Sequence, residues 1–160
     1  PPMDHACPPP AHPDASPSPE GKALSPEGKA LSFEGKALAT LAPVVAAPIS
    51  RHVLVCTGKS CAANGSEATL QAFYDETAKR GLLYGKRGSP DGTVLVSKAG
   101  SMGLCAVGPA VMVYPDGTWY YGVQPGDVAE IVEAHLLGGR PVARLLARAG
   151  WADGGPGMGP

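Results

Sequence analysis

Short apolar runs between residues 50 and 123 predict a β-sheet. The stretch HVLVCT (52–57) is continuous, apolar and rich in β-branched residues, which is typical of a buried strand. The stretches TVLVSKA (93–99) and AVMVY (110–114) have the same character. The turn residues PDG separate the last of these from TWYYGV (118–123), so we predict that the two segments form a hairpin.

The helical period recurs in residues 66–80. Asn64 stands before this segment and Glu67 follows three positions later, which predicts a capping box. The segment GKSCAANG (58–65) in front of it is expected to be a loop. The inward face of the helix is expected to hold Leu70, Phe73, Tyr74 and Thr77.

A second helix is predicted in residues 125–139 and ends at Gly138. A short amphipathic helix is expected to follow in 140–150, with Val142, Leu145 and Leu146 on one side. The inward residues of the longer helix are expected to be Val128, Ile131, Val132 and Leu136.

The predicted order of elements is β-α-β-β-β-α. If the first two strands are parallel, the helix between them makes a right-handed crossover. A mixed sheet built in this order, with helices on its faces, is the thioredoxin-like plan, so the expected fold class is α/β, of the α+β kind.

The residues before this fold have a different composition. Residues 1–49 are rich in Pro, Ala and Ser, and contain the unit SPEGKAL twice and SFEGKAL once, starting at Ser18, Ser25 and Ser32. Each unit holds one Leu and one Gly, which opposes a coiled coil and favours a flexible tether. We therefore divide the chain into a leader (1–49), a thioredoxin-like domain (50–148) and a tail (149–160).

Charge and hydropathy oppose nucleic-acid-binding, membrane-spanning and secreted classes of protein. The formal net charge is −1, and residues 51–150 hold ten Lys/Arg against eight Asp/Glu, so nothing favours nucleic acid. No apolar run reaches the roughly 18 residues of a membrane span. The opening residues lack the pattern of a secretory signal, and we expect a cytoplasmic protein with no membrane partner.

The candidate chemistry lies in the cysteines, which are Cys7, Cys56, Cys61 and Cys105. Three thiols in one domain make a poor disulfide framework but a good start for a metal or cluster site. Cys56 ends the first strand and Cys61 follows it, while Cys105 precedes the third strand. In a thioredoxin-like sheet these loops neighbour each other, so we expect the three thiols to converge.

A [2Fe–2S] cluster needs four protein ligands, which thiolates fill best. The cluster is anionic, and small residues together with a helix start near Gly65 would let backbone N–H groups approach it. The plant-type spacing C-x4-C-x2-C fails here, because Asn64 stands where its third cysteine would be. Small residues that suit such a site are Gly58, Ala62, Gly65, Gly103 and Gly108.

The stretches HVLVCTGKSCAANGSEATLQAF and SMGLCAVGPAVMVYPDGTWYYGVQPGDVAEIVEAHLLGGRPV resemble the thioredoxin-like [2Fe–2S] ferredoxins, relatives of the small [2Fe–2S] subunit of respiratory complex I. The family pattern is C-x4-C or a longer gap, then C-x3-C before Gly-Pro and a strand. By that resemblance Cys56, Cys61 and Cys105 match ligands, and Ser101 occupies the fourth ligand position. The resemblance implies a one-electron carrier rather than an enzyme, with redox partner proteins and a homodimer through the sheet hairpin.

Ser101 leaves three interpretations open. It binds iron through its alkoxide, or the fourth ligand is exchangeable and comes from water or Cys7, or the site holds no cluster. The alternatives in function are a thiol–disulfide oxidoreductase that uses Cys56 and Cys61, and a cluster-free interaction module. A zinc site is opposed by the lack of histidine in either cysteine loop. Pro109 stands before the third strand, and a trans peptide bond is its default.

Overall fold

The computed structural model describes residues 40–150, so the repeats, Cys7 and most of the predicted leader and tail lie outside the described residues. The domain boundaries at 50 and 148 stay predictions. No helix between residues 40 and 150 is long and apolar enough to cross a membrane. The strands are β1 (Arg51–Cys56), β2 (Val94–Ala99), β3 (Val111–Tyr114), β4 (Thr118–Tyr120) and β5 (Leu146–Arg148). The helices and helical turns are η1 (Pro43–Ala46), α2 (Lys59–Ala63), α3 (Ser66–Lys79), η2 (Cys105–Val107), η3 (Pro125–Asp127), α4 (Val128–Glu130), the π-helical η4 (Ile131–Leu137) and η5 (Ala143–Leu145).

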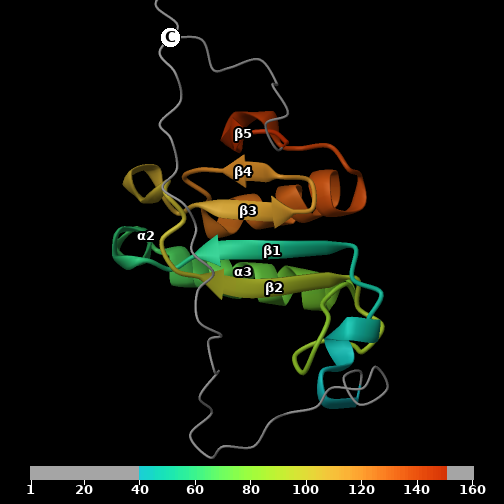
Figure 1. The fold of residues 1–160 in the computed structure, drawn as a ribbon. Coiled ribbons are helices and arrows are strands. Elements are labelled where there is room, and N and C mark those ends of the chain that lie inside the picture. The colour runs from blue at the N-terminus through green and yellow to red at the C-terminus, as the bar shows by residue number, and fades with distance from the viewer. Residues whose placement is uncertain (1–39, 151–160) are drawn as a thin grey trace, which may run out of the picture. The chain divides into compact units, whose positions relative to one another are not determined.

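The strands form one five-stranded sheet in the order β2-β1-β3-β4-β5. β1 and β2 are parallel, and every other neighbouring pair is antiparallel. Figure 1 shows α3 behind β1 and β2, with the C-terminal helical segment behind β3 and β4. The mixed thioredoxin-like sheet is thus confirmed, but the two long helical segments share one face of it rather than covering both.

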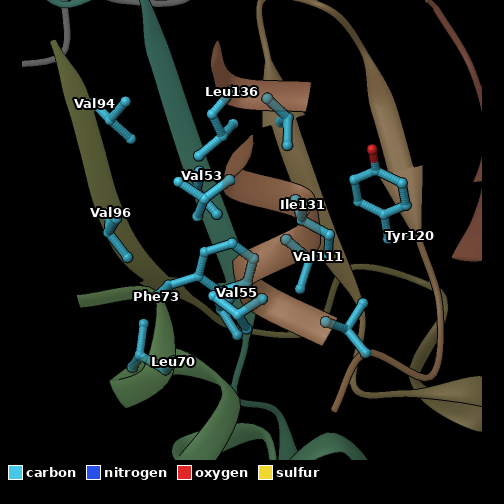
Figure 2. Close-up of a cluster of buried hydrophobic side chains, with 14 of the residues drawn as sticks. Val53, Val55, Leu70, Phe73, Val94, Val96, Val111, Tyr120, Ile131 and Leu136 are labelled. Carbon is cyan, nitrogen blue, oxygen red and sulfur yellow. The ribbon is translucent and has the colours of Figure 1, made fainter. Parts of the chain in front are cut away.

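The core lies between that face and the helices. Strand residues alternate, so that Val53 and Val55 of β1 point inward toward Phe73 of α3 and Ile131 of η4 (Figure 2). Phe73, Val53 and Val55 are fully buried. The inward faces predicted for both helices are confirmed, with Tyr74 at the edge, where its hydroxyl donates to the Val96 carbonyl at 3.2 Å.

Two local predictions were wrong, those of a loop in 58–65 and of a capping box at the start of the next helix. Residues 59–63 form the short helix α2 instead of a loop, and Asn64 ends that helix instead of capping the next. Gly65, with φ of 87°, is the residue in front of α3, and no side chain caps it. The Gly108–Pro109 peptide bond, whose isomer the sequence leaves open, is cis.

The predicted helix in 140–150 was also wrong. The chain makes the turn η5 and then adds β5 to the sheet edge, where Tyr120 pairs with Leu146 and Trp119 with Arg148. The Tyr121 N–H donates to the Leu145 carbonyl at 3.0 Å. The free edge of β4 therefore satisfies its backbone groups by pairing, which outweighs the helical spacing of three leucine and valine side chains.

A buried polar chain fastens the hairpin to the C-terminal helix. The Val142 N–H donates to the Tyr120 hydroxyl at 3.1 Å, and that hydroxyl lies 2.8 Å from His135 Nδ1. His135 Nε2 lies 2.9 Å from Asp116, which also accepts from Arg51 Nε at 2.9 Å. Burial lowers the pKa of His135, so the ring is neutral, and the Asp116 carboxylate holds its proton on Nε2. Nδ1 then accepts from the Tyr120 hydroxyl.

Candidate functional site

Three cysteine sulfurs meet at the end of the sheet where β1 and β2 finish. Cys56 is the last residue of β1 and pairs with Ala99 of β2, so it lies beside the loop that follows β2. Cys61 lies in α2, and Cys105 opens η2. The three Sγ atoms lie within 4.8 Å of one another, and those of Cys56 and Cys105 are 3.6 Å apart. The expected convergence of the two cysteine loops is confirmed.

Ser101 stands at the solvent side of this thiol group. Its Oγ lies 3.3 Å from Cys105 Sγ, and the residue is exposed. Cys56 and Cys61 are fully buried, whereas Cys105 is only partly buried. The site therefore has a closed side made by two thiols and an open side made by one thiol and one hydroxyl.

The two sides differ in how readily their thiols ionise. Hydrogen bonds from the Ser101 hydroxyl, then from the Met102 backbone N–H, lower the pKa of Cys105 to about 7. Burial raises the pKa of Cys61 to about 11, although the Ala110 backbone N–H opposes that shift. Cys105 is thus the ready thiolate, while Cys61 needs a bound cation to stabilise its charged form.

Small residues bring the backbone close to the sulfurs. A Cβ atom added at Gly108 would overlap Cys61 Sγ, and one at Gly58 would lie 3.4 Å from the Ser101 Cα and 3.7 Å from Cys56 Sγ. Met102, Leu104 and Ala110 pack against the thiols as an apolar wall.

This donor set fits an iron–sulfur cluster. Three soft thiol ligands with backbone N–H groups directed at sulfur suit such a cluster, and the Ser101 hydroxyl stands beside them as the candidate for the fourth place. Within residues 40–150 no histidine joins them, because the His52 ring contacts Ser97 and the His135 ring contacts Tyr120 and Asp116. A zinc site with a histidine ligand therefore has no support in this part of the chain. Cys7, the other candidate ligand, lies outside the described residues.

A hollow of about 630 Å³ opens beside the exposed side of the site. Met102 and Leu104, which stand between Ser101 and Cys105 in sequence, form part of its wall, and Trp119 and Tyr121 form another part. Arg148 is the one charged residue in its lining. The hollow therefore extends from the loop that holds Ser101 and Cys105 to the edge strand β5.

Two contributors to the site were missed from sequence. Ala110 directs its N–H at Cys61, and the Gly100 carbonyl accepts a bond from Cys56 Sγ at 3.0 Å. Both act through backbone atoms, so their residue types carry no signal. The one available hint was their position beside the loop that holds Ser101 and Cys105, since Gly100 directly follows one predicted strand and Ala110 begins the next.

Comparison with known proteins gives consistent matches. The family model described as thioredoxin-like [2Fe–2S] ferredoxin matches residues 45–136. A "Ferredoxin, 2Fe-2S" from Aquifex aeolicus is 40% identical over 112 residues, which cover 65% of this chain and 95% of that protein. A protein of the same name from Clostridium pasteurianum is 36% identical over 104 residues, covering 59% and 92%.

Solved structures agree with the sequence matches. The thioredoxin-like [2Fe–2S] ferredoxin from Aquifex aeolicus superposes with a TM-score of 0.55 and 38% identity, covering 66% of this chain and 97% of that one. Two further structures are cysteine-to-serine variants of the same protein, with 40% and 38% identity and a TM-score of 0.52 each. Each covers 61% of this chain and 98% of the variant.

Proposed function

The chain belongs to the thioredoxin-like [2Fe–2S] ferredoxin family, and from this premise we propose how its own residues hold the cluster and where its partner docks. It is an electron carrier with a [2Fe–2S] cluster. When bound, the cluster supplies one-electron redox chemistry. The chain supplies the ligands, the burial and the hydrogen bonds that set its reduction potential.

The ligands in this proposal are Cys56, Cys61, Cys105 and Ser101. The observation that carries it is the approach of three sulfurs to within 4.8 Å, with the Ser101 hydroxyl 3.3 Å from Cys105. The two Aquifex aeolicus variants carry serine at positions four residues apart, the same spacing that separates Ser101 from Cys105. Serine beside a cysteine at this spacing is therefore compatible with the fold of that relative.

Serine in the fourth place has a chemical consequence. Its hydroxyl is much harder to deprotonate than a thiol, and its oxygen is a harder donor than sulfur. The cluster should therefore be more labile, and its reduction potential lower, than with four thiolates. Before iron binds, the same hydroxyl keeps Cys105 poised as a thiolate.

The electron passes on the open side of the site. Cys56 and Cys61 are fully buried, so Ser101 and Cys105 provide the short route to the surface. The apolar hollow beside them suits a redox partner protein that recognises shape more than charge. We propose that the chain works as a separate cytoplasmic carrier rather than as a fixed part of a larger oxidoreductase.

A homodimer through the β3–β4 hairpin completes the proposal. Tyr114 at the end of β3 is 53% exposed, which leaves a large aromatic side chain available to a second copy. Light scattering during gel filtration should give twice the mass of one chain. Tyr114→Lys should then give a monomer that keeps its visible spectrum, and a monomeric wild type would refute this part.

Anaerobic purification tests the cluster and its ligands. Wild-type protein should be reddish-brown, with about two irons and two sulfides per chain. Ser101→Cys should stabilise the cluster and raise its potential, whereas Ser101→Ala should release iron faster to a chelator. Cys7→Ser is the matched control and should change nothing. If Ser101→Ala behaves as wild type while Cys7→Ser loses iron, the fourth ligand is Cys7 and the assignment fails.

A further inference from the structure

Ser66 carries a hydroxyl that the chain leaves without a partner. The residue is fully buried, and within residues 40–150 its Oγ is one of two buried side-chain polar atoms with no hydrogen bond. Buried polar groups are nearly always satisfied, because an unmade bond costs the full loss of hydration. A missing acceptor is therefore expected at this position.

Ser66 begins the fourteen-residue helix α3, directly after the short helix that carries Cys61. Figure 1 shows this start of α3 at the same end of the sheet as α2 and the end of β1. Cys56 is the last residue of β1, so the hydroxyl and the thiols belong to one end of the molecule.

Hydrogen bonds from the first turn of α3 tie it to the ligand loop. Thr69 stands one turn after Ser66 on the same buried face, and its Oγ1 donates to the Val123 carbonyl at 2.8 Å. The Val123 N–H donates to the Pro109 carbonyl at 3.1 Å. Pro109 follows Gly108, where an added Cβ would overlap Cys61 Sγ. Ser66 thus stands one helical turn before a residue that is linked to this loop through Val123.

None of the three thiols, whose sulfurs lie within 4.8 Å of one another, accepts a hydrogen bond from Ser66. A bound [2Fe–2S] cluster would supply the hydrogen-bond acceptor that Ser66 lacks, because its inorganic sulfides can accept hydrogen bonds. A helix N-terminus also favours negative charge through its dipole, and α3 starts here. An anionic acceptor at this place would therefore satisfy the Ser66 hydroxyl and interact favourably with the start of α3.

We propose that Ser66 is a positioning residue whose hydroxyl donates a hydrogen bond to a sulfide of the bound cluster. Such a bond stabilises the reduced, more negative state and raises the reduction potential. This inference rests on the proposed function, and the wild-type spectrum separates the two. A colourless wild type would refute the cluster itself, whereas the variants below are compared only with coloured protein.

The test is a redox titration of three variants in the cluster-loaded protein. Ser66→Ala should shift the potential to a more negative value, up to about a tenfold change in the one-electron equilibrium, which is about 59 mV. Ser66→Thr keeps the hydroxyl and should stay near wild type. Thr77→Ala removes another fully buried hydroxyl of α3, one already bonded to the Phe73 carbonyl at 2.6 Å, and should leave the potential unchanged.

Each other outcome has a defined meaning. If Ser66→Ala loses its colour while Ser66→Thr keeps it, the hydroxyl is needed to hold the cluster and the proposal stands. If Ser66→Ala titrates together with wild type and Thr77→Ala, the hydroxyl does not reach sulfur and the proposal is overturned. Loss of the cluster from both Ser66 variants also overturns it, because packing rather than the hydroxyl would then matter.

Discussion

Replacement of Tyr120 by Phe isolates the buried polar chain that fastens the hairpin to the C-terminal helix. The ring stays in place and remains fully buried, so little apolar area changes. Two groups lose their partner, namely His135 Nδ1 and the Val142 N–H. His135 gains nothing by moving its proton to Nδ1, because Nε2 would then turn a lone pair toward Asp116.

The expected loss follows from those two groups. Each buried polar group left unsatisfied costs about 1–3 kcal/mol, so the free energy of unfolding should fall by about 2–6 kcal/mol. For a domain of this size each kcal/mol corresponds to about 4 °C in the thermal midpoint. Tyr120→Phe should therefore unfold about 8–24 °C below wild type.

Thermal unfolding of the cluster-loaded protein, followed by far-UV circular dichroism at one scan rate, measures this shift. Tyr114→Phe is the matched control, because Tyr114 is 53% exposed and loss of its hydroxyl should change stability by less than about 0.5 kcal/mol. If the two variants unfold within 2 °C of each other, by the same scale of about 4 °C per kcal/mol, the polar chain does not stabilise the fold. The proton assignment for His135 would then lose its support.

Three further outcomes follow from the structure. Gly108→Ala should leave the far-UV spectrum intact but lower iron content well below wild type, since its Cβ would displace the Cys61 sulfur. Full iron content would contradict the close approach of the Gly108 backbone to that sulfur. Burial lowers the pKa of both His135 and His52, so the unfolded state binds protons more readily. The free energy of unfolding should therefore be highest above the unfolded pKa of about 6.5 and should fall as the pH drops below it. In urea titrations at several pH values, His52→Gln and His135→Gln should each remove part of that decline. Gly65→Ala meets no atom within 4 Å but forces a positive φ, so it should cost about 1–2 kcal/mol of unfolding free energy, and a neutral result would contradict the left-handed turn.

The sheet could be predicted because its strands are short, apolar and separated by strong turn signals. The stretch around Val53 and Val55 is buried by two helices, and its sequence already shows that continuous burial. Convergence of Cys56, Cys61 and Cys105 followed once the strand order was fixed, because parallel neighbours end at the same edge.

Other features depend on partners far away in sequence. β5 has three residues and no distinctive period, and it forms because β4 offers a free edge. The bonds among Tyr120, His135 and Asp116 join residues 15 and 19 positions apart, a spacing that no local pattern marks. Ser66 gave no signal either, because a serine near a helix start is ordinarily a cap rather than a buried donor.

The placement of Cys56 and Cys61 on different kinds of element bears on which insertions and deletions this protein family can accept. Cys56 is fixed by its ladder position opposite Ala99, so one residue inserted into β1 or β2 would turn the whole strand over and bury its polar side. Cys61 is carried by α2, outside the sheet, and a longer excursion before it disturbs no strand pairing. The structure should therefore tolerate an insertion between the first two thiols better than one within the strands that frame them.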